Sequence, residues 1–131
     1  MLSKSEWIKS WLAKATNDLK TAERIIDSDD PLSDIACYHS QQCAEKALKA
    51  FLTSKEVTFE KTHDLVALNV LCRKIDAKFI EINETCILLM PYAVETCYPG
   101  SLDGFSVDEA RNAIQNARIV LDFVVGKLTN S

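Results

Sequence analysis

The spacing of apolar residues limits what this chain can fold into more than any other feature. In every apolar segment these residues recur at steps of three and four, which is the helix period, and no segment alternates as a strand does. Only three glycines and three prolines are available for turns among 131 residues, which favours a few long elements over a many-stranded sheet. The sequence therefore predicts an all-α protein. The clearest series, near the N-terminus, is Ile8, Leu12, Ala15, Leu19, Ala22 and Ile26.

Capping signals divide the chain into five predicted helices. Ser3 with Glu6, and Ser106 with Glu109, have the spacing of a capping box. Asp30-Pro31 joins an N-cap acid to a proline at the first helical position. The predicted helices run from after Ser3 or Ser5 to about residues 27–30, from about Pro31 to Ser54, from a cap at Thr62 or Asp64 to about Ile75, from about Lys78 to Cys97, and from Ser106 to about Leu128.

These helices predict one domain over residues 1–131, because a chain of this length has room for one core. Four long helices are expected to form an up-and-down bundle, with the additional short third helix at one end. Pro91 falls inside the fourth helix and predicts a kink or break there. The inward-facing residues expected of the last three helices are Leu65, Leu68, Cys72 and Ile75; Phe79, Ile82, Cys86, Leu89, Met90, Ala93 and Cys97; and Ala110, Ala113, Ile114, Ala117, Leu121, Val124 and Leu128.

Composition narrows the functional classes. A net charge of -4 disfavours strong general binding to nucleic acid, because phosphate affinity comes mainly from lysine and arginine. Five cysteines without a C-x-x-C pair are typical of buried free thiols in a reducing cytosol and not of a zinc site. No signal peptide or membrane-spanning apolar run is present, so we expect a cytoplasmic protein without membrane contact. No motif for a cofactor or a metal is present either.

The second predicted helix carries a polar stripe. His39, Gln42, Lys46 and Lys49 recur at steps of three and four, so their side chains share one helix face. An imidazole, an amide and two amines in register suit a phosphate or another polar ligand. The alternative is an ordinary solvated face, in which Lys49 pairs with Glu45 one turn away. The apolar stripe beside it is Ala36, Cys43, Ala47, Ala50 and Phe51.

Three segments resemble one family. Residues 39–50 read His-Ser-Gln-Gln-Cys-Ala-Glu-Lys-Ala-Leu-Lys-Ala, close to the second helix of HEPN domains. Thr62-His63-Asp64-Leu65 is similar to the family's entry to the third helix, and Tyr98-Pro99-Gly100 to its exit from the fourth. The resemblance implies a helical bundle that commonly pairs as a homodimer. Among small stand-alone members it implies a toxin–antitoxin-like pairing with a minimal nucleotidyltransferase and binding of a nucleotide or another anion.

The resemblance also raises a second function, that of a metal-independent ribonuclease toxin. The marker of that activity is an arginine four to six residues before a histidine. His39 and His63 are the two histidines here, and neither follows an arginine at that spacing. Relatives often carry an arginine just before the tyrosine of Tyr-Pro-Gly, where this chain has Cys97. We therefore expect a binding and assembly protein, assign no catalytic residue, and keep the ribonuclease as the alternative.

Six residues are the predicted ligand-binding set: His39, Gln42, Lys46, Lys49, His63 and Tyr98. Tyr98 joins the set through the resemblance, which places the Tyr-Pro-Gly turn beside the second helix. A partly buried Lys46 needs an acceptor, and we expect an incoming anion or a partner's carboxylate to supply it. On that expectation Lys46→Ala weakens binding and leaves the melting temperature almost unchanged. Trp7 and Trp11, one turn apart, either cover the core or form the dimer contact.

Overall fold

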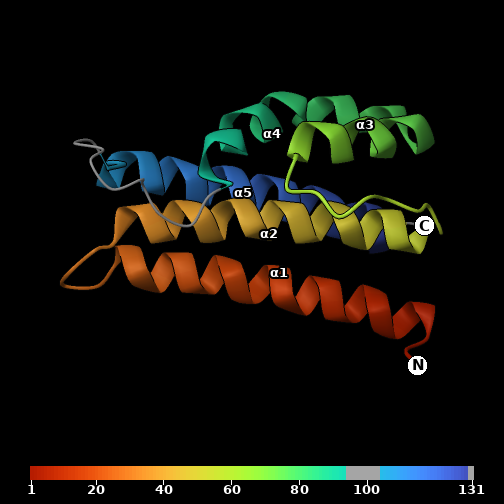
Figure 1. Cartoon of the computed structure of the whole chain (residues 1–131), viewed down its shortest axis with the longest axis horizontal. Coiled ribbons are helices and arrows are strands. Elements are labelled where there is room, and N and C mark those ends of the chain that lie inside the picture. The colour runs from red at the N-terminus through yellow and green to blue at the C-terminus, as the bar shows by residue number, and fades with distance from the viewer. Residues whose placement is uncertain (94–103, 130–131) are drawn as a thin grey trace.

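The computed structural model describes residues 1–93 and 104–129. Three long helices, α1 (Lys4–Ile26), α2 (Ser33–Ser54) and α5 (Val107–Thr129), run side by side, and α2 packs against both of the others (Figure 1). The shorter α3 (Leu65–Ile75) and α4 (Asn83–Leu89) lie together over α2 and α5 (Figure 1). The described residues form helices and no strands, so the predicted all-α architecture with five helices is confirmed.

The caps follow the chemistry that the sequence indicates. Ser3 and Glu6 form the complete capping box at α1, with the Ser3 hydroxyl accepting from the Glu6 amide at 3.2 Å. The Ser106 hydroxyl accepts from the Glu109 amide at 3.0 Å at the start of α5. Of the two candidates for α3, the cap is Asp64, whose carboxylate accepts from the Ala67 amide at 3.0 Å.

The start of α2 differs from the prediction. The helix begins at Ser33, so Leu32 and not Asp30 occupies the N-cap position, and no side chain caps it. An acidic side chain in the first turn of α2, Asp34, makes a hydrogen bond to a distant segment instead. Its carboxylate accepts from the Phe105 amide at 2.7 Å. That bond attaches the beginning of α2 to the segment entering α5, an interaction between distant parts of the chain that a local capping pattern cannot show.

The predicted fourth helix is broken into shorter pieces. The chain forms the 3₁₀-helix η1 (Ala77–Ile82), then α4, then the 3₁₀ turn η2 (Met90–Tyr92), which contains Pro91. Proline has no amide hydrogen and clashes with the preceding turn, which explains the end of α4 at Leu89. The bundle therefore has three long helices among the described residues and not four. The predicted extension to Cys97 and the Tyr98-Pro99-Gly100 exit lie outside the described residues.

The core surrounds α2, which is buried on nearly every side. The apolar stripe from Ala36 to Phe51 is buried as predicted, but so are Ser40, Gln41, Gln42, Glu45 and Lys49. Burial of this many polar groups requires partners inside the molecule. One expected core residue, Ile75, is instead 39% exposed, because it ends α3 at the edge of the bundle.

Candidate functional site

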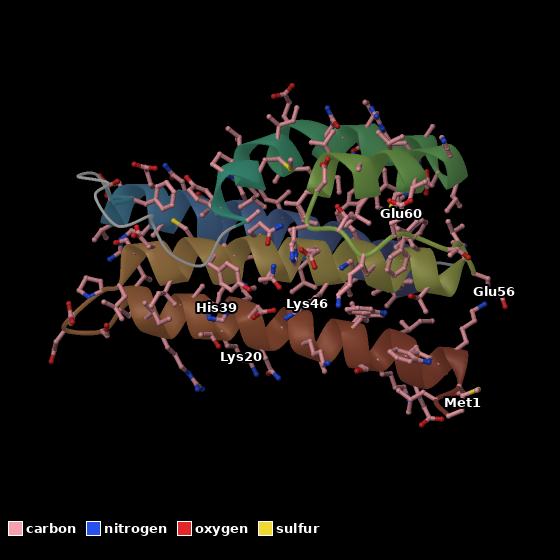
Figure 2. The ribbon with its side chains drawn as sticks, in the orientation of Figure 1. Met1, Lys20, His39, Lys46, Glu56 and Glu60 are labelled. Atoms are coloured by element: carbon pink, nitrogen blue, oxygen red, sulfur yellow. The ribbon has the colours of Figure 1, made fainter. Side chains whose placement is uncertain are left out.

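The carboxylate of Asp18 on α1 pairs with two basic side chains of the polar stripe. Its carboxylate oxygens lie 2.8 Å from His39 Nδ1 and 2.6 Å from Lys46 Nζ. His39 and Lys46 are two helical turns apart on α2, so both reach the seam between α2 and α1, where Figure 2 shows them. Asp18 itself is buried beside Leu19 of the apolar series on α1.

Glu45 on α2 is the centre of a second polar cluster. Its buried carboxylate accepts from Lys49 Nζ at 2.9 Å and from Gln42 Nε2 at 3.3 Å, and lies 2.8 Å from His63 Nδ1. Gln41 joins the cluster by donating to the His63 backbone carbonyl at 2.9 Å. The segment that leads into α3 is thus tied to α2 at both the backbone and the ring of His63.

Aromatic rings cover the lysine of this second cluster. Lys49 Nζ lies 5.7 Å from the centre of the Trp11 ring and 5.9 Å from that of Phe59, a geometry that favours a cation. The Trp11 and Phe59 rings pack against each other with centres 6.4 Å apart. Trp11 therefore packs over a lysine of its own chain, and its predicted dimer contact stays a prediction. Trp7 is 46% exposed, and its predicted dimer contact stays a prediction.

Each cluster pairs an imidazole and an ammonium group with one carboxylate. A carboxylate at Nδ1 fixes the orientation of an imidazole, and the side chain of His63 is 64% exposed, so its ring is accessible from solvent. In both clusters, however, the lysine charge is offset by the same carboxylate. Little positive charge is left to stabilise an anionic transition state, and no arginine belongs to either cluster as the structure describes them.

The structure brings five of the six predicted residues into these two clusters. His39 and Lys46 meet on Asp18, while Gln42, Lys49 and His63 meet on Glu45. Tyr98 lies outside the described residues.

Two expectations about the lysines are corrected. The acceptor of Lys46 comes from within the chain, from Asp18, and not from an incoming anion or a partner's carboxylate. The Glu45–Lys49 pair exists as the alternative expected, but both side chains are at least nine-tenths buried, so this part of the helix is not a solvated face.

Sequence reasoning missed Asp18, one of the two acids that organise the site. Asp18 immediately precedes Leu19 in the apolar series of α1, and an acid at the edge of such a seam was an available signal. Gln41 was also missed, although it adjoins the stripe. Among the described residues no three His, Cys, Asp or Glu side chains are grouped in a way that could hold a metal ion.

Comparisons with known proteins identify the fold and the family. The helical bundle resembles two solved structures: an archaeal HEPN homologue, ST0689, with 23% identity, a TM-score of 0.74 and coverage of 92% of this chain and 96% of that chain; and TT1696 from Thermus thermophilus, with 26% identity, a TM-score of 0.73 and coverage of 92% and 97%. The sequence model of the HEPN domain matches residues 8–128. The chain belongs to the HEPN domain family. No curated protein matches it.

Of the helices that the structure describes, none has the length and apolar character needed to span a bilayer.

Proposed function

We propose that this chain is a non-catalytic HEPN binding and assembly protein that acts as a cytoplasmic homodimer and pairs with a minimal nucleotidyltransferase in a toxin–antitoxin-like system. The observation that carries the non-catalytic part is that the lysine of each cluster is paired with an in-chain carboxylate, Lys46 with Asp18 and Lys49 with Glu45. Cleavage of RNA by its own 2'-hydroxyl needs a base together with an uncompensated cation at the phosphate. The pairing with a transferase rests on the family resemblance.

The surface proposed for the partner is the exposed edge of the two clusters, formed by His39, Lys46 and His63. The clusters fix these side chains in place, and a rigid polar surface loses little entropy when a partner binds. Gln42 and Lys49 are buried beneath this edge, where both donate hydrogen bonds to Glu45. A nucleotide or another anion at the same edge is part of the proposal, with Tyr98 as a further contact.

Co-expression tests the proposal. The chain is produced together with a minimal nucleotidyltransferase encoded in the neighbouring reading frame, and the complex is measured by light scattering after gel filtration. We expect a complex that contains two copies of this chain. Because His63 is largely exposed, His63→Ala should weaken the complex at least tenfold without unfolding the bundle. The control is Lys20→Ala, which changes an exposed lysine on the outer side of α1 (Figure 2).

Two results would contradict the proposal. The first is a chain that elutes as a monomer with the transferase present. The second is robust metal-independent RNA cleavage by the purified chain that is lost in His63→Ala, which would establish the ribonuclease alternative.

A further inference from the structure

A hollow of about 790 Å³ is lined by residues from the C-terminal parts of α2, α3 and α5. These helices end on the right in Figure 1. This volume lies within the range of small-molecule sites, about 300–1,000 Å³. The hollow is separate from the two polar clusters, because its lining includes neither histidine and neither of the acids that hold them. Its walls are Phe51, Lys55, Ile75, Asp76, Ala77, Lys78, Asp122, Phe123, Gly126 and Lys127.

The floor of the hollow is apolar and partly uncovered. Phe51 and Phe123 line it and both pack against the buried ring of Phe79, with ring centres 4.4 Å and 4.9 Å apart. Ile75 adds an aliphatic side chain that is exposed although its helix period predicts burial. Rigidly packed rings beside an uncovered aliphatic group form a surface suited to a flat apolar ring.

Lysines surround this floor. Lys127 pairs with Asp76 at 2.7 Å, and the hydrogen bond from Lys127 holds the pKa of Asp76 below its usual value, so this pair stays ionised. Lys55 Nζ lies 5.7 Å from the centre of the Phe51 ring, which holds its charge at the wall of the hollow. Within the described residues, neither Lys55 nor Lys78 has a carboxylate partner at its ammonium group. Asp122 is the one acid in the lining besides Asp76.

Gly126 leaves one part of the wall of this hollow open. A glycine inside a helix costs about 1 kcal/mol relative to alanine, so it usually serves packing or function. A Cβ added at Gly126 would meet nothing within 4 Å, which shows that no group of the described chain needs the space. The glycine instead widens the wall of the hollow.

We propose that this hollow binds a small aromatic anion, a flat ring that carries one phosphate or carboxylate group. The ring lies on Phe123, Ile75 and the open side of Gly126, and the anionic group is bound by Lys55 and Lys78. The assignment is independent of the transferase pairing, because the hollow shares no residue with the proposed partner surface.

Phenyl phosphate is the probe, and the amide signal of Gly126 in the proton–nitrogen spectrum of the labelled full chain is the readout. The chain has three glycines, so this signal is readily assigned by its loss in Gly126→Ala. We expect a saturable shift of the Gly126 signal with phenyl phosphate and a much weaker response to inorganic phosphate or to phenol, which each supply half of the ligand. The full chain is used throughout.

Two charge variants with opposite expected effects on the affinity for phenyl phosphate test the proposal. Lys55→Gln with Lys78→Gln should weaken phenyl phosphate binding at least tenfold, whereas Asp122→Asn should tighten it, because that change removes a negative charge from the lining. Lys20→Gln, on the outer side of α1, should have no effect. If the lysines serve only to offset the partial negative charge of the helix ends, no saturable shift occurs at millimolar phenyl phosphate, and the proposal is wrong. Equal affinity in the double lysine variant and the wild type would also overturn it.

Discussion

The buried pair of Glu45 and Lys49 gives the sharpest test of how the polar face of α2 works. The two side chains bond at 2.9 Å and are only 4% and 8% exposed. Removing one member of a buried pair strands the other charge, which typically costs about 3–5 kcal/mol, whereas replacing both by well-packed neutral groups is often close to neutral. The perturbation is therefore a cycle of Glu45→Gln, Lys49→Met and the double variant.

The structure sets the size of each step. Glu45→Gln strands Lys49, while the exposed ring of His63 can turn to water, so we expect a loss of about 3 kcal/mol in the free energy of unfolding. Lys49→Met leaves Glu45 with His63 and Gln42, which lowers the expected loss to about 2 kcal/mol. In the double variant the methionine packs between Trp11 and Phe59, and the loss should be about 1–2 kcal/mol.

Urea unfolding followed by circular dichroism measures these free energies. The double variant should be at least about 2 kcal/mol more stable than the sum of the single changes implies. The control is Glu56→Gln in the exposed Lys4–Glu56 pair, whose groups are 3.9 Å apart and which should change stability by less than about 0.5 kcal/mol. Single changes that add to within about 0.5 kcal/mol would refute the reasoning, because independent sites are additive.

Four further outcomes are expected. Gly126→Ala should raise the free energy of unfolding by about 0.5–1 kcal/mol in urea titration, because the added methyl group meets open space; a loss of stability would contradict this. Asp64→Ala should lower it by about 1 kcal/mol, as the α3 cap is lost, with the exposed Glu60→Ala as control. Burial raises the pKa of the described thiols, for example that of Cys43 to about 12, so in Cys97→Ser native thiols should resist a disulfide reagent at pH 8 until the chain unfolds. The unfolded chain releases these protons near pH 9 and the folded chain does not, so stability should fall as pH rises from about 9 towards 12.

The helix period was sufficient to predict the fold because α1 and α5 each bury one stripe at helical spacing, and the apolar stripe of α2 is buried as well. Ala15, Leu19 and Ala22 of α1 are all buried at their predicted positions. The errors lie where contacts between distant segments overrule local signals. The Asp34 carboxylate accepts from the Phe105 amide just before α5, and α2 begins later than predicted. Ile75 ends α3 at the edge of the bundle and is 39% exposed in the part of the chain that the structure describes.

The site was predictable only in part, because a stripe of bases on one helix does not reveal which acids face it. His39, Gln42, Lys46 and Lys49 were found from their spacing on α2. Asp18, which faces two of them, comes from another helix, and no local pattern relates the two segments. The hollow at the end of the bundle was not predictable either, since its lining comes from three helices and the segment after α3.

The in-chain acceptor of Lys46 changes what a binding experiment can show. Lys46→Ala removes one of the two bases on Asp18, a carboxylate that is almost fully buried, so the variant should lose stability as well as any partner contact. The expectation of an unchanged melting temperature therefore no longer holds.

Asp18→Asn separates the loss of stability from the loss of a partner contact, because it releases Lys46 without removing it. An anion that binds Lys46 must first displace Asp18, so such an anion should bind Asp18→Asn more tightly than the wild type. A transferase that recognises the fixed surface of His39, Lys46 and His63 should instead bind Asp18→Asn more weakly. Comparing the two affinities by calorimetry at a temperature where both forms are folded distinguishes a ligand site from an assembly surface.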